Sequence, residues 1–350
     1  MRLMALTNKA GWLYFLGETD FKTGESFGYV KIGKTDHDRP VAARMNDHQT
    51  GNPRDIIEVV PSIRTHFIDD LETYMHHRFA TKRVHGEWFH LDQAELDEVV
   101  EEAIRVNELL NTVQPEASEL IDLKDVESNG KLVEPTPQNK SDYENFIKFE
   151  KERVLCKLNQ DICTVKLRAL TLDNGGIEDI STHSTVNRNP TFDKDSFAKA
   201  HPEIIAKYTV TESKLSRGYK ITGKPTAVNA FATTNEQCKA AKAKLPEVKS
   251  VKESMVNRGS SVETLHNEWL ELHEAESQAR IEAEIYSLKL QHSCGVNEGI
   301  EGICAWKRIT KESTRLDATA LKNAESNLYE SFLVPQSSIN RFKVTDYRAY

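Results

Sequence analysis

The chain has 350 residues and a formal net charge of −8, with 38% hydrophobic and 29% charged residues. These values are typical of a soluble globular protein with more than one core, and they exclude a surface that is basic throughout. No apolar run approaches the roughly 18 residues that a membrane span needs, so we expect no membrane partner. The N-terminal residues lack the pattern of a secretory signal peptide, and the five cysteines form no CxxC pair. We therefore expect a reduced, cytosolic protein.

Residues 1–111 predict one compact α+β domain with the element order β-β-α-β-α-α. Short runs rich in aromatic and β-branched residues predict three strands, at 11–17, 27–33 and 55–63. Amphipathic stretches predict three helices, at 38–49, 67–83 and 92–110. Pro61 indicates that the third strand lies at an edge of the sheet or contains a bulge. In the second helix, Ile68, Leu71, Met75 and Phe79 form an apolar stripe, and the pair Asp92 and Glu95 predicts a capping box for the third.

The remaining residues predict two linkers that separate two further modules. Polar, proline-containing composition predicts linkers at 112–141 and 223–260. The first module covers 142–222. The second covers 261–350 and begins with a long charged helix, which we expect to be a packing or dimerisation helix.

Both modules contain a similar segment, which predicts a duplicated small α/β unit. The first copy is 176–222 and the second copy is 299–345; they have equal length and both begin with Gly-Ile-Glu-x-Ile. Each copy has an aspartate followed by apolar residues four, eleven and fifteen positions later, which predicts one helical face behind an N-cap. These aspartates are Asp193 and Asp317. Both copies end in an aromatic-Lys-apolar-Thr strand.

Chemically reactive side chains are concentrated in the N-terminal domain. The stretch "GYVKIGKT" places Lys31 and Lys34 around Gly33 at the end of an apolar strand. Glu72 and His76 lie four positions apart on a predicted helix and therefore share a face. By themselves they indicate an ordinary surface pair more often than a carboxylate that binds a hard cation.

The order of these motifs resembles the GIY-YIG nuclease superfamily. "WLYFLG" is similar to the first motif and "VKIGKT" to the second, followed by Arg44, "LETYMHHRF" and "GEWFHL". The resemblance covers residues 11–91 and is strongest to the phage branch whose second motif reads Lys-Ile-Gly. It implies a nuclease that cuts a phosphodiester with one divalent ion, Mg²⁺ or Mn²⁺.

The resemblance also implies a role for each matching residue. Glu72 would bind the metal, Arg44 would neutralise charge on the phosphate, and Tyr14 would match the tyrosine near the attacking water. Lys31 stands where most members have a second tyrosine. The resemblance therefore implies that Tyr14, His76 or a metal hydroxide takes up the proton, and that Lys31 contacts phosphate. Candidate nucleic-acid contacts in this domain are Gly33, Lys34 and Arg83.

Basic residues around a tryptophan in the second copy suit either a nucleic-acid surface or a buried strand. The candidates are Trp306, Lys307 and Arg308, with Arg188 at the similar place in the first copy.

The sequence thus favours a metal-dependent DNA endonuclease of a phage or mobile element, acting in the host cytoplasm, whose C-terminal modules select the target site. Cutting both strands would need a homodimer or two sequential events. The alternatives are a DNA-binding regulator with an impaired nuclease fold and a protein-interaction scaffold.

Overall fold

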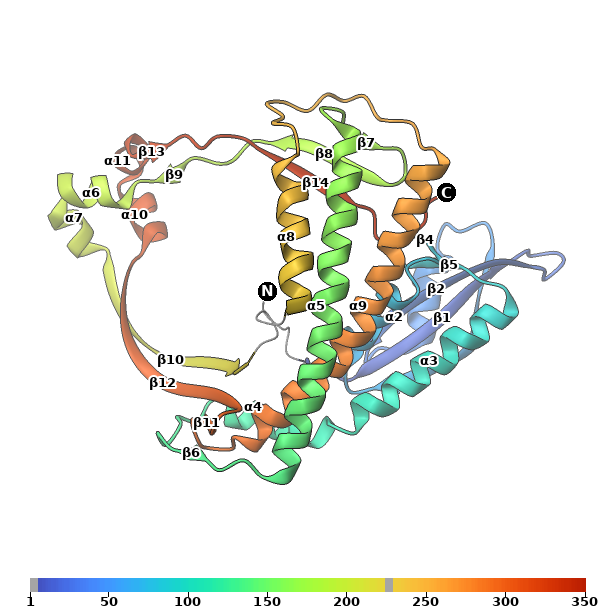
Figure 1. Ribbon diagram of the computed structural model, residues 1–350, viewed down its shortest axis with the longest axis horizontal. Helices are drawn as coiled ribbons and strands as arrows, with labels where there is room; N and C mark the ends of the chain where they lie inside the picture. The colour runs from blue at the N-terminus through green and yellow to red at the C-terminus, as the bar shows by residue number, and fades with distance from the viewer. Residues whose placement is uncertain (1–5, 224–228) are drawn as a thin grey trace.

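The N-terminal part of the chain is an antiparallel sheet with helices on both faces, as Figure 1 shows for the computed structural model, which describes residues 6–223 and 229–350. The sheet order is β3-β1-β2-β5-β4. The strands are β1 (Gly11–Thr19), β2 (Ser26–Asp36), β3 (Asp55–Thr65), β4 (Arg83–His85) and β5 (Trp88–His90). The three expected strands are confirmed, and β3 is an edge strand whose register with β1 shifts near Pro61. The small β4–β5 hairpin was not expected.

The expected helices of this domain also form. They are α1 (Val41–Gln49), α2 (Ile68–Arg78) and α3 (Gln93–Asn111). The apolar stripe of α2 is fully buried, because Ile68, Leu71 and Met75 each have an exposed fraction of 0%. Asp92 and Glu95 form the expected capping box at the start of α3. The α+β class is therefore confirmed.

The two stretches expected to be linkers contain regular structure, which corrects that interpretation. The first contains α4 (Gln114–Leu123), β6 (Leu132–Val133) and the start of α5 (Pro137–Thr171), and the second contains α8 (Asn229–Ala243). Pro115 and Pro137 favour a linker by composition, but both lie in the first turn of a helix, where no amide hydrogen is needed. Ala117 and Leu120 join the core through the apolar face of α4.

Two long helices, α5 and α9 (Ser260–Ser293), pack antiparallel and form the centre of the molecule (Figure 1). Trp269 Nε1 donates to Thr164 Oγ1 near one end of the pair, at 2.9 Å. Further along, the buried Arg153 lies between Glu150 and Glu276, at 2.7 and 3.3 Å. The expectation that α9 is a packing helix is confirmed within the chain. No helix among the described residues is long and apolar enough to cross a bilayer.

The two copies contain equivalent elements. The first has β7 (Gly176–Ile177), β8 (Ser181–Val186), β9 (Thr191–Phe192), α6 (Lys194–Ala200), α7 (Pro202–Lys207) and β10 (Thr209–Ile221). The second has β11 (Gly299–Ile300), β12 (Cys304–Leu316), α10 (Ala318–Ala324), α11 (Ser326–Ser331), β13 (Leu333–Val334) and β14 (Ile339–Val344). Asp193 and Asp317 both cap the helix that follows them, as expected. The expected single helix, however, is divided into two short helices in each copy, because the chain leaves the helical conformation at His201 and Glu325.

The copies pair reciprocally, each with its last strand against the second strand of the other. β10 pairs with β12 to form the long ribbon, and β14 pairs with β8 to form the short ribbon. The two ribbons leave opposite ends of the α5–α9 pair and meet at a tip made of α6, α7, α10 and α11 (Figure 1). We infer an internal two-fold relation between the copies.

One buried core connects the N-terminal sheet with the helices. Phe15 of β1, Val106 of α3, Ile285 of α9 and Trp306 of β12 belong to the same cluster of buried side chains. The N-terminal domain is therefore packed against the rest of the chain.

Candidate active site

Tyr14 lies in the middle of β1 and its ring covers Gly33 of the neighbouring strand. The two residues are direct partners in the β1–β2 register, and the tyrosine is fully buried. A Cβ atom on Gly33 would lie 2.5 Å from the Tyr14 hydroxyl oxygen. The glycine is therefore needed to make room for the ring, which explains its place in the motif better than the expected contact with substrate.

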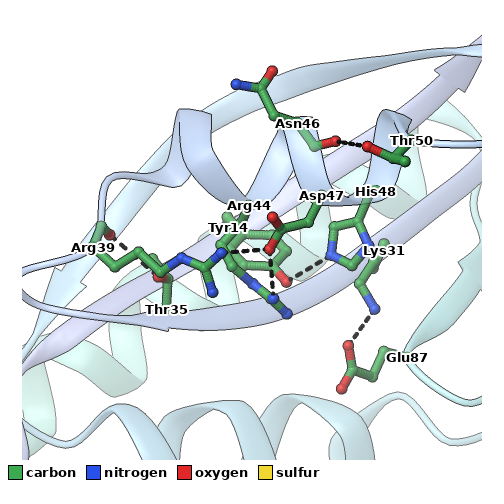
Figure 2. Close-up of polar contacts among 10 residues, drawn as sticks. All are labelled: Tyr14, Lys31, Thr35, Arg39, Arg44, Asn46, Asp47, His48, Thr50 and Glu87. Atoms are coloured by element: carbon green, nitrogen blue, oxygen red, sulfur yellow. Dashed lines mark hydrogen bonds and ion pairs between the residues drawn. The ribbon is translucent and has the colours of Figure 1, made fainter.

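α1 places two further side chains over this face of the sheet, and Figure 2 shows them around the tyrosine. His48 Nε2 lies 3.3 Å from the Tyr14 hydroxyl. Arg44 lies one turn earlier on the helix, and its Nη1 is 3.1 Å from Asp47 Oδ2. Burial raises the pKa of Tyr14; the Arg44 guanidinium partly opposes this, and the Glu87 and Glu72 carboxylates add to it. Burial, together with the Lys31 and Arg44 charges, lowers the pKa of His48.

Lys31 lies on the same face of β2 as Gly33, two positions earlier. Its exposed fraction is only 8%, and its ammonium forms an ion pair with Glu87, which lies between β4 and β5 (Figure 2). Burial tends to raise the pKa of Glu87, but the hydrogen bond and charge of Lys31 outweigh it, so the pKa lies below its usual range. The positive charge of Lys31 is therefore neutralised by Glu87.

Lys34 projects to the opposite face of β2, toward α2. Its Nζ is 2.8 Å from Glu72 Oε2 and 2.7 Å from Asp69 Oδ1. Glu72 is largely buried, with an exposed fraction of 8%. The carboxylate expected to bind metal is therefore paired with an ammonium group in this state.

His76 supports the free edge of β2. β5 pairs with β2 only as far as Lys31, and beyond that point His76 Nε2 lies 2.7 Å from the carbonyl oxygen of Ile32. A carbonyl only accepts, so Nε2 carries the proton, and burial lowers the pKa of the ring. This contact makes His76 a positioning residue and leaves its Nε2 unable to act as a base.

The five expected residues therefore lie along residues 31–34 of β2, on two sides of the sheet: Tyr14, Lys31 and Arg44 on the side of α1, and Glu72 and His76 on α2. Glu72 lies close enough to Tyr14 to raise its pKa, although the two side chains come from opposite faces of the sheet. Sequence reasoning missed His48 and Asp69. The available signal was helical spacing, because His48 lies four positions after Arg44 and Asp69 three positions before Glu72.

Residues 11–104 match the T5orf172 domain, a phage-associated nuclease-type domain. The match covers every residue of the candidate site, from Tyr14 to Glu87. No curated protein and no solved structure matches the chain. The T5orf172 match thus supports a nuclease-type role for the N-terminal domain.

Glu72 and Asp69 of the T5orf172 domain have the chemistry to hold a divalent ion. Lys34 lies beside both carboxylates, and Lys9 Nζ lies 3.9 Å from Asp69 Oδ1, so Glu72 has only the ammonium that it shares with Asp69. Mg²⁺ and Mn²⁺ bind through one or two carboxylates together with water and substrate phosphate, and this donor set fits them.

A second group of possible ligands lies outside the site. Among the described residues, the ligand atoms of His77, His273 and Asp346 lie within 4.8 Å of one another. Arg83 Nη2, however, is 3.0 Å from Asp346 Oδ1, so the carboxylate already has a cation beside it. We interpret this group as a contact that joins α2, α9 and the C-terminal residues.

Three of the expected nucleic-acid contacts are buried, which corrects that expectation. Arg83 has an exposed fraction of 6% and is held by Asp346. Trp306 and Arg308 are 1% and 0% exposed, and the guanidinium stacks on the indole at 3.8 Å. Arg308 also donates to the carbonyl oxygens of Leu123 and Gly295, so it fixes the base of the long ribbon. By contrast, the structure leaves Arg188 and Lys307 exposed.

Proposed function

We propose that this chain is a metal-dependent endonuclease, encoded by a phage or mobile element, that hydrolyses DNA phosphodiester bonds with a GIY-YIG-type site. Homing or attack on rival DNA are uses that fit such an enzyme, with the C-terminal modules selecting the target. The observation that carries the proposal is that β1, α1 and α2 place Tyr14, Arg44 and Glu72 along one stretch of β2, within the T5orf172 match: Tyr14 lies opposite Gly33 with Arg44 beside it, and Glu72 contacts Lys34.

The chain's own groups suggest how protons and charge are handled. His48 has a lowered pKa and is neutral near pH 7, so its Nε2 can accept a proton from the Tyr14 hydroxyl or from a water beside it. Arg44 supplies positive charge for the phosphate oxygens. This assigns proton transfer to the Tyr14–His48 pair rather than to His76 or Lys31.

Glu72, with Asp69 beside it, would hold Mg²⁺ or Mn²⁺. A bound divalent ion would supply charge that polarises the phosphate and stabilises the leaving oxygen. Lys34 neutralises the same carboxylates in the absence of metal, and a phosphate nearby gives its ammonium a second anionic partner.

Cleavage of plasmid DNA tests this function. Purified protein is incubated with supercoiled plasmid and with single-stranded DNA in Mg²⁺ or Mn²⁺, beside EDTA. We expect metal-dependent nicks or linear product, and loss of at least about 100-fold in rate for Glu72→Gln. Glu101→Gln, an equal change at an exposed position of α3, serves as the matched control. Equal cleavage by Glu72→Gln and wild type would contradict the proposal.

The alternative function is a DNA-binding regulator whose nuclease fold does not cut. It is favoured by one observation: Lys31 stands in place of the second tyrosine and its charge is neutralised by Glu87. A salt-sensitive DNA complex without strand breaks, under all metal conditions and on varied DNA, would support this alternative. If cleavage occurs, whether a homodimer forms on DNA follows from comparing nicked and linear products at different protein concentrations.

A further inference from the structure

The long ribbon has one face that is buried near its base and one basic face. Side chains alternate along each strand, so Tyr219 and Trp306 pack toward the core while their neighbours point away. Five basic residues share the outer face and are exposed: Lys214, Lys220, Lys307, Lys311 and Arg315. Its one acidic residue is Glu212, which pairs with Arg315 at 2.7 Å. The face therefore has a strong positive charge on a chain whose net charge is −8.

The lysines of this face are arranged in a way that does not stabilise the ribbon. Lys214 and Lys311 lie directly opposite each other in the register. Like charges at such a cross-strand pair are destabilising. Among the described residues no carboxylate forms an ion pair with Lys214, Lys220 or Lys311, whereas Lys307 has Glu298 at 3.3 Å. A bound polyanion would remove this repulsion.

The short ribbon repeats the pattern on a smaller scale. Arg341 and Lys343 of β14 are exposed and lie opposite Ser184 and Thr182 of β8, so this face has no acidic residue. Lys343 precedes the last strand residue of the second copy, as Lys220 does in the first. Basic side chains thus recur at equivalent places in the two copies.

We propose that these outer faces bind the phosphate backbone of duplex DNA, the long ribbon supplying most of the contacts. A two-stranded ribbon fits the major groove, and lysine and arginine with serine and threonine are the usual phosphate contacts. The two ribbons leave opposite ends of the α5–α9 pair (Figure 1), so they would contact the DNA at two places. Thr81 binds Glu274 of α9 at 2.7 Å, which holds the nuclease-type domain against the same helices.

The proposal rests on DNA being the target, as in the proposed function, but it concerns a different surface. The test therefore measures binding in the full chain that carries Glu72→Gln. Fluorescence anisotropy gives the Kd for a labelled mixed-sequence duplex at several salt concentrations. The ribbon variant combines Lys214→Gln, Lys220→Gln and Lys311→Gln. The control combines Lys151→Gln, Lys239→Gln and Lys244→Gln, an equal charge change at exposed sites off the ribbons.

We expect the ribbon variant to bind at least about 10-fold more weakly at 100 mM salt, and the control to bind like its parent. The slope of log Kd against log salt should fall by about 0.9 for each phosphate that the variant no longer neutralises, so by roughly 2 to 3. Because a like-charge pair is removed, the melting temperature of the ribbon variant should equal or exceed that of its parent, which excludes misfolding as the cause.

Equal DNA binding by the ribbon variant and the control would overturn the proposal, as would a preference of this face for anionic vesicles over DNA. The outcome is separable from the nuclease test. A wild-type protein that never cuts, together with ribbon-dependent binding, leaves the ribbon proposal standing while the endonuclease fails. If wild-type protein cuts DNA but the ribbon variant binds DNA as well as its parent, the endonuclease proposal stands and the ribbon proposal fails.

Discussion

Lys31 and Lys34 are three positions apart on β2 and project to opposite faces of the sheet. Lys31 pairs with Glu87 on the side of α1, and Lys34 pairs with Glu72 and Asp69 on the side of α2. Each ammonium neutralises a carboxylate that would otherwise be partly buried and unpaired, which would be costly. The two lysines therefore stabilise the folded site by pairing its carboxylates.

Lys34→Gln should strengthen metal binding. Removal of the ammonium leaves Glu72 without a counter-charge and leaves Asp69 with only the more distant Lys9, at 3.9 Å. At these distances one unit charge is worth at least about 1 kcal/mol, so we expect the Kd for Mn²⁺ to fall at least about fivefold. Mn²⁺ titration followed by electron paramagnetic resonance measures this without activity. Lys22→Gln, on the β1–β2 turn, is the control, and unchanged or weaker Mn²⁺ binding by Lys34→Gln would contradict the competition.

Gly33→Ala should destabilise the domain through Tyr14. The added Cβ would lie 2.5 Å from the hydroxyl oxygen in a site with no spare room, and such overpacking costs about 1–3 kcal/mol. In a Tyr14→Ala background the same change should cost close to nothing, because the ring is gone. Urea unfolding of the four proteins in this cycle measures the coupling, and equal costs in both backgrounds would show that the ring does not cause the strain.

Each copy begins at a position that only glycine can occupy. Gly176 and Gly299 have φ angles of 133° and 154°, and a Cβ there would lie 2.1 and 2.2 Å from the carbonyl oxygens of Ser181 and Cys304. The same turn therefore connects each long helix to its ribbon. This repetition of backbone detail supports the internal two-fold relation independently of the strand pairing.

Gly299→Ala should lower the free energy of unfolding by about 2 kcal/mol or more, because it adds both backbone strain and a steric clash. Gly218→Ala is the matched control: this glycine of β10 has no atom within 4 Å of the Cβ position. Urea denaturation compares the midpoints. If the two variants unfold at the same urea concentration, the turn accommodates the added methyl group and the predicted strain is absent.

At the element scale, local patterns predicted most of the N-terminal domain. Short runs of aromatic and β-branched residues identified β1, β2 and β3. The period-3.6 apolar pattern identified α2, because that helix has one buried face. The linker interpretation failed where prolines mark helix starts. Trp306 and Arg308 were misassigned for another reason: alternation shows that they share a face, opposite Lys307, but not which face is covered. That depends on α4 and α9, which are distant in sequence.

The sequence predicted only those site residues that lie within the motifs. Tyr14, Arg44 and Glu72 were found because they lie at fixed places in ordered motifs. The pairing of Lys31 with Glu87 and the contact of His48 with Tyr14 join residues far apart in the chain. Such contacts depend on how strands and helices pack, which local spacing does not specify.

The whole molecule is held together where α2, α9 and the C-terminal residues meet. The rings of His77 and His273 lie 4.4 Å apart between their centroids. Arg83 bridges to Asp346, and the Arg348 amide donates to the Arg83 carbonyl oxygen at 2.8 Å. The nuclease-type domain is thus fastened to the ribbon-bearing part through polar groups that are largely buried.

This junction should make the protein sensitive to acid. Burial, reinforced by the neighbouring ring, lowers the pKa of His77 to about 3, and burial lowers that of His273 to about 4. Both values lie below the ordinary 6.5, so the unfolded chain binds more protons than the folded chain between pH 6.5 and these values. The stability from two neutral rings is complete above pH 6.5 and is lost as pH falls toward 4 and 3.

The expected slope is up to about 1.4 kcal/mol per pH unit for each histidine. The double variant His77→Gln and His273→Gln should have a flatter dependence of unfolding free energy on pH, because neither side chain titrates. Urea unfolding at pH 7.5, 6 and 5 measures the difference. His37→Gln, at an exposed position, should leave the wild-type slope intact. A double variant that loses stability with acid as steeply as wild type would place the acid-sensitive groups elsewhere and would leave the junction without a role in acid unfolding.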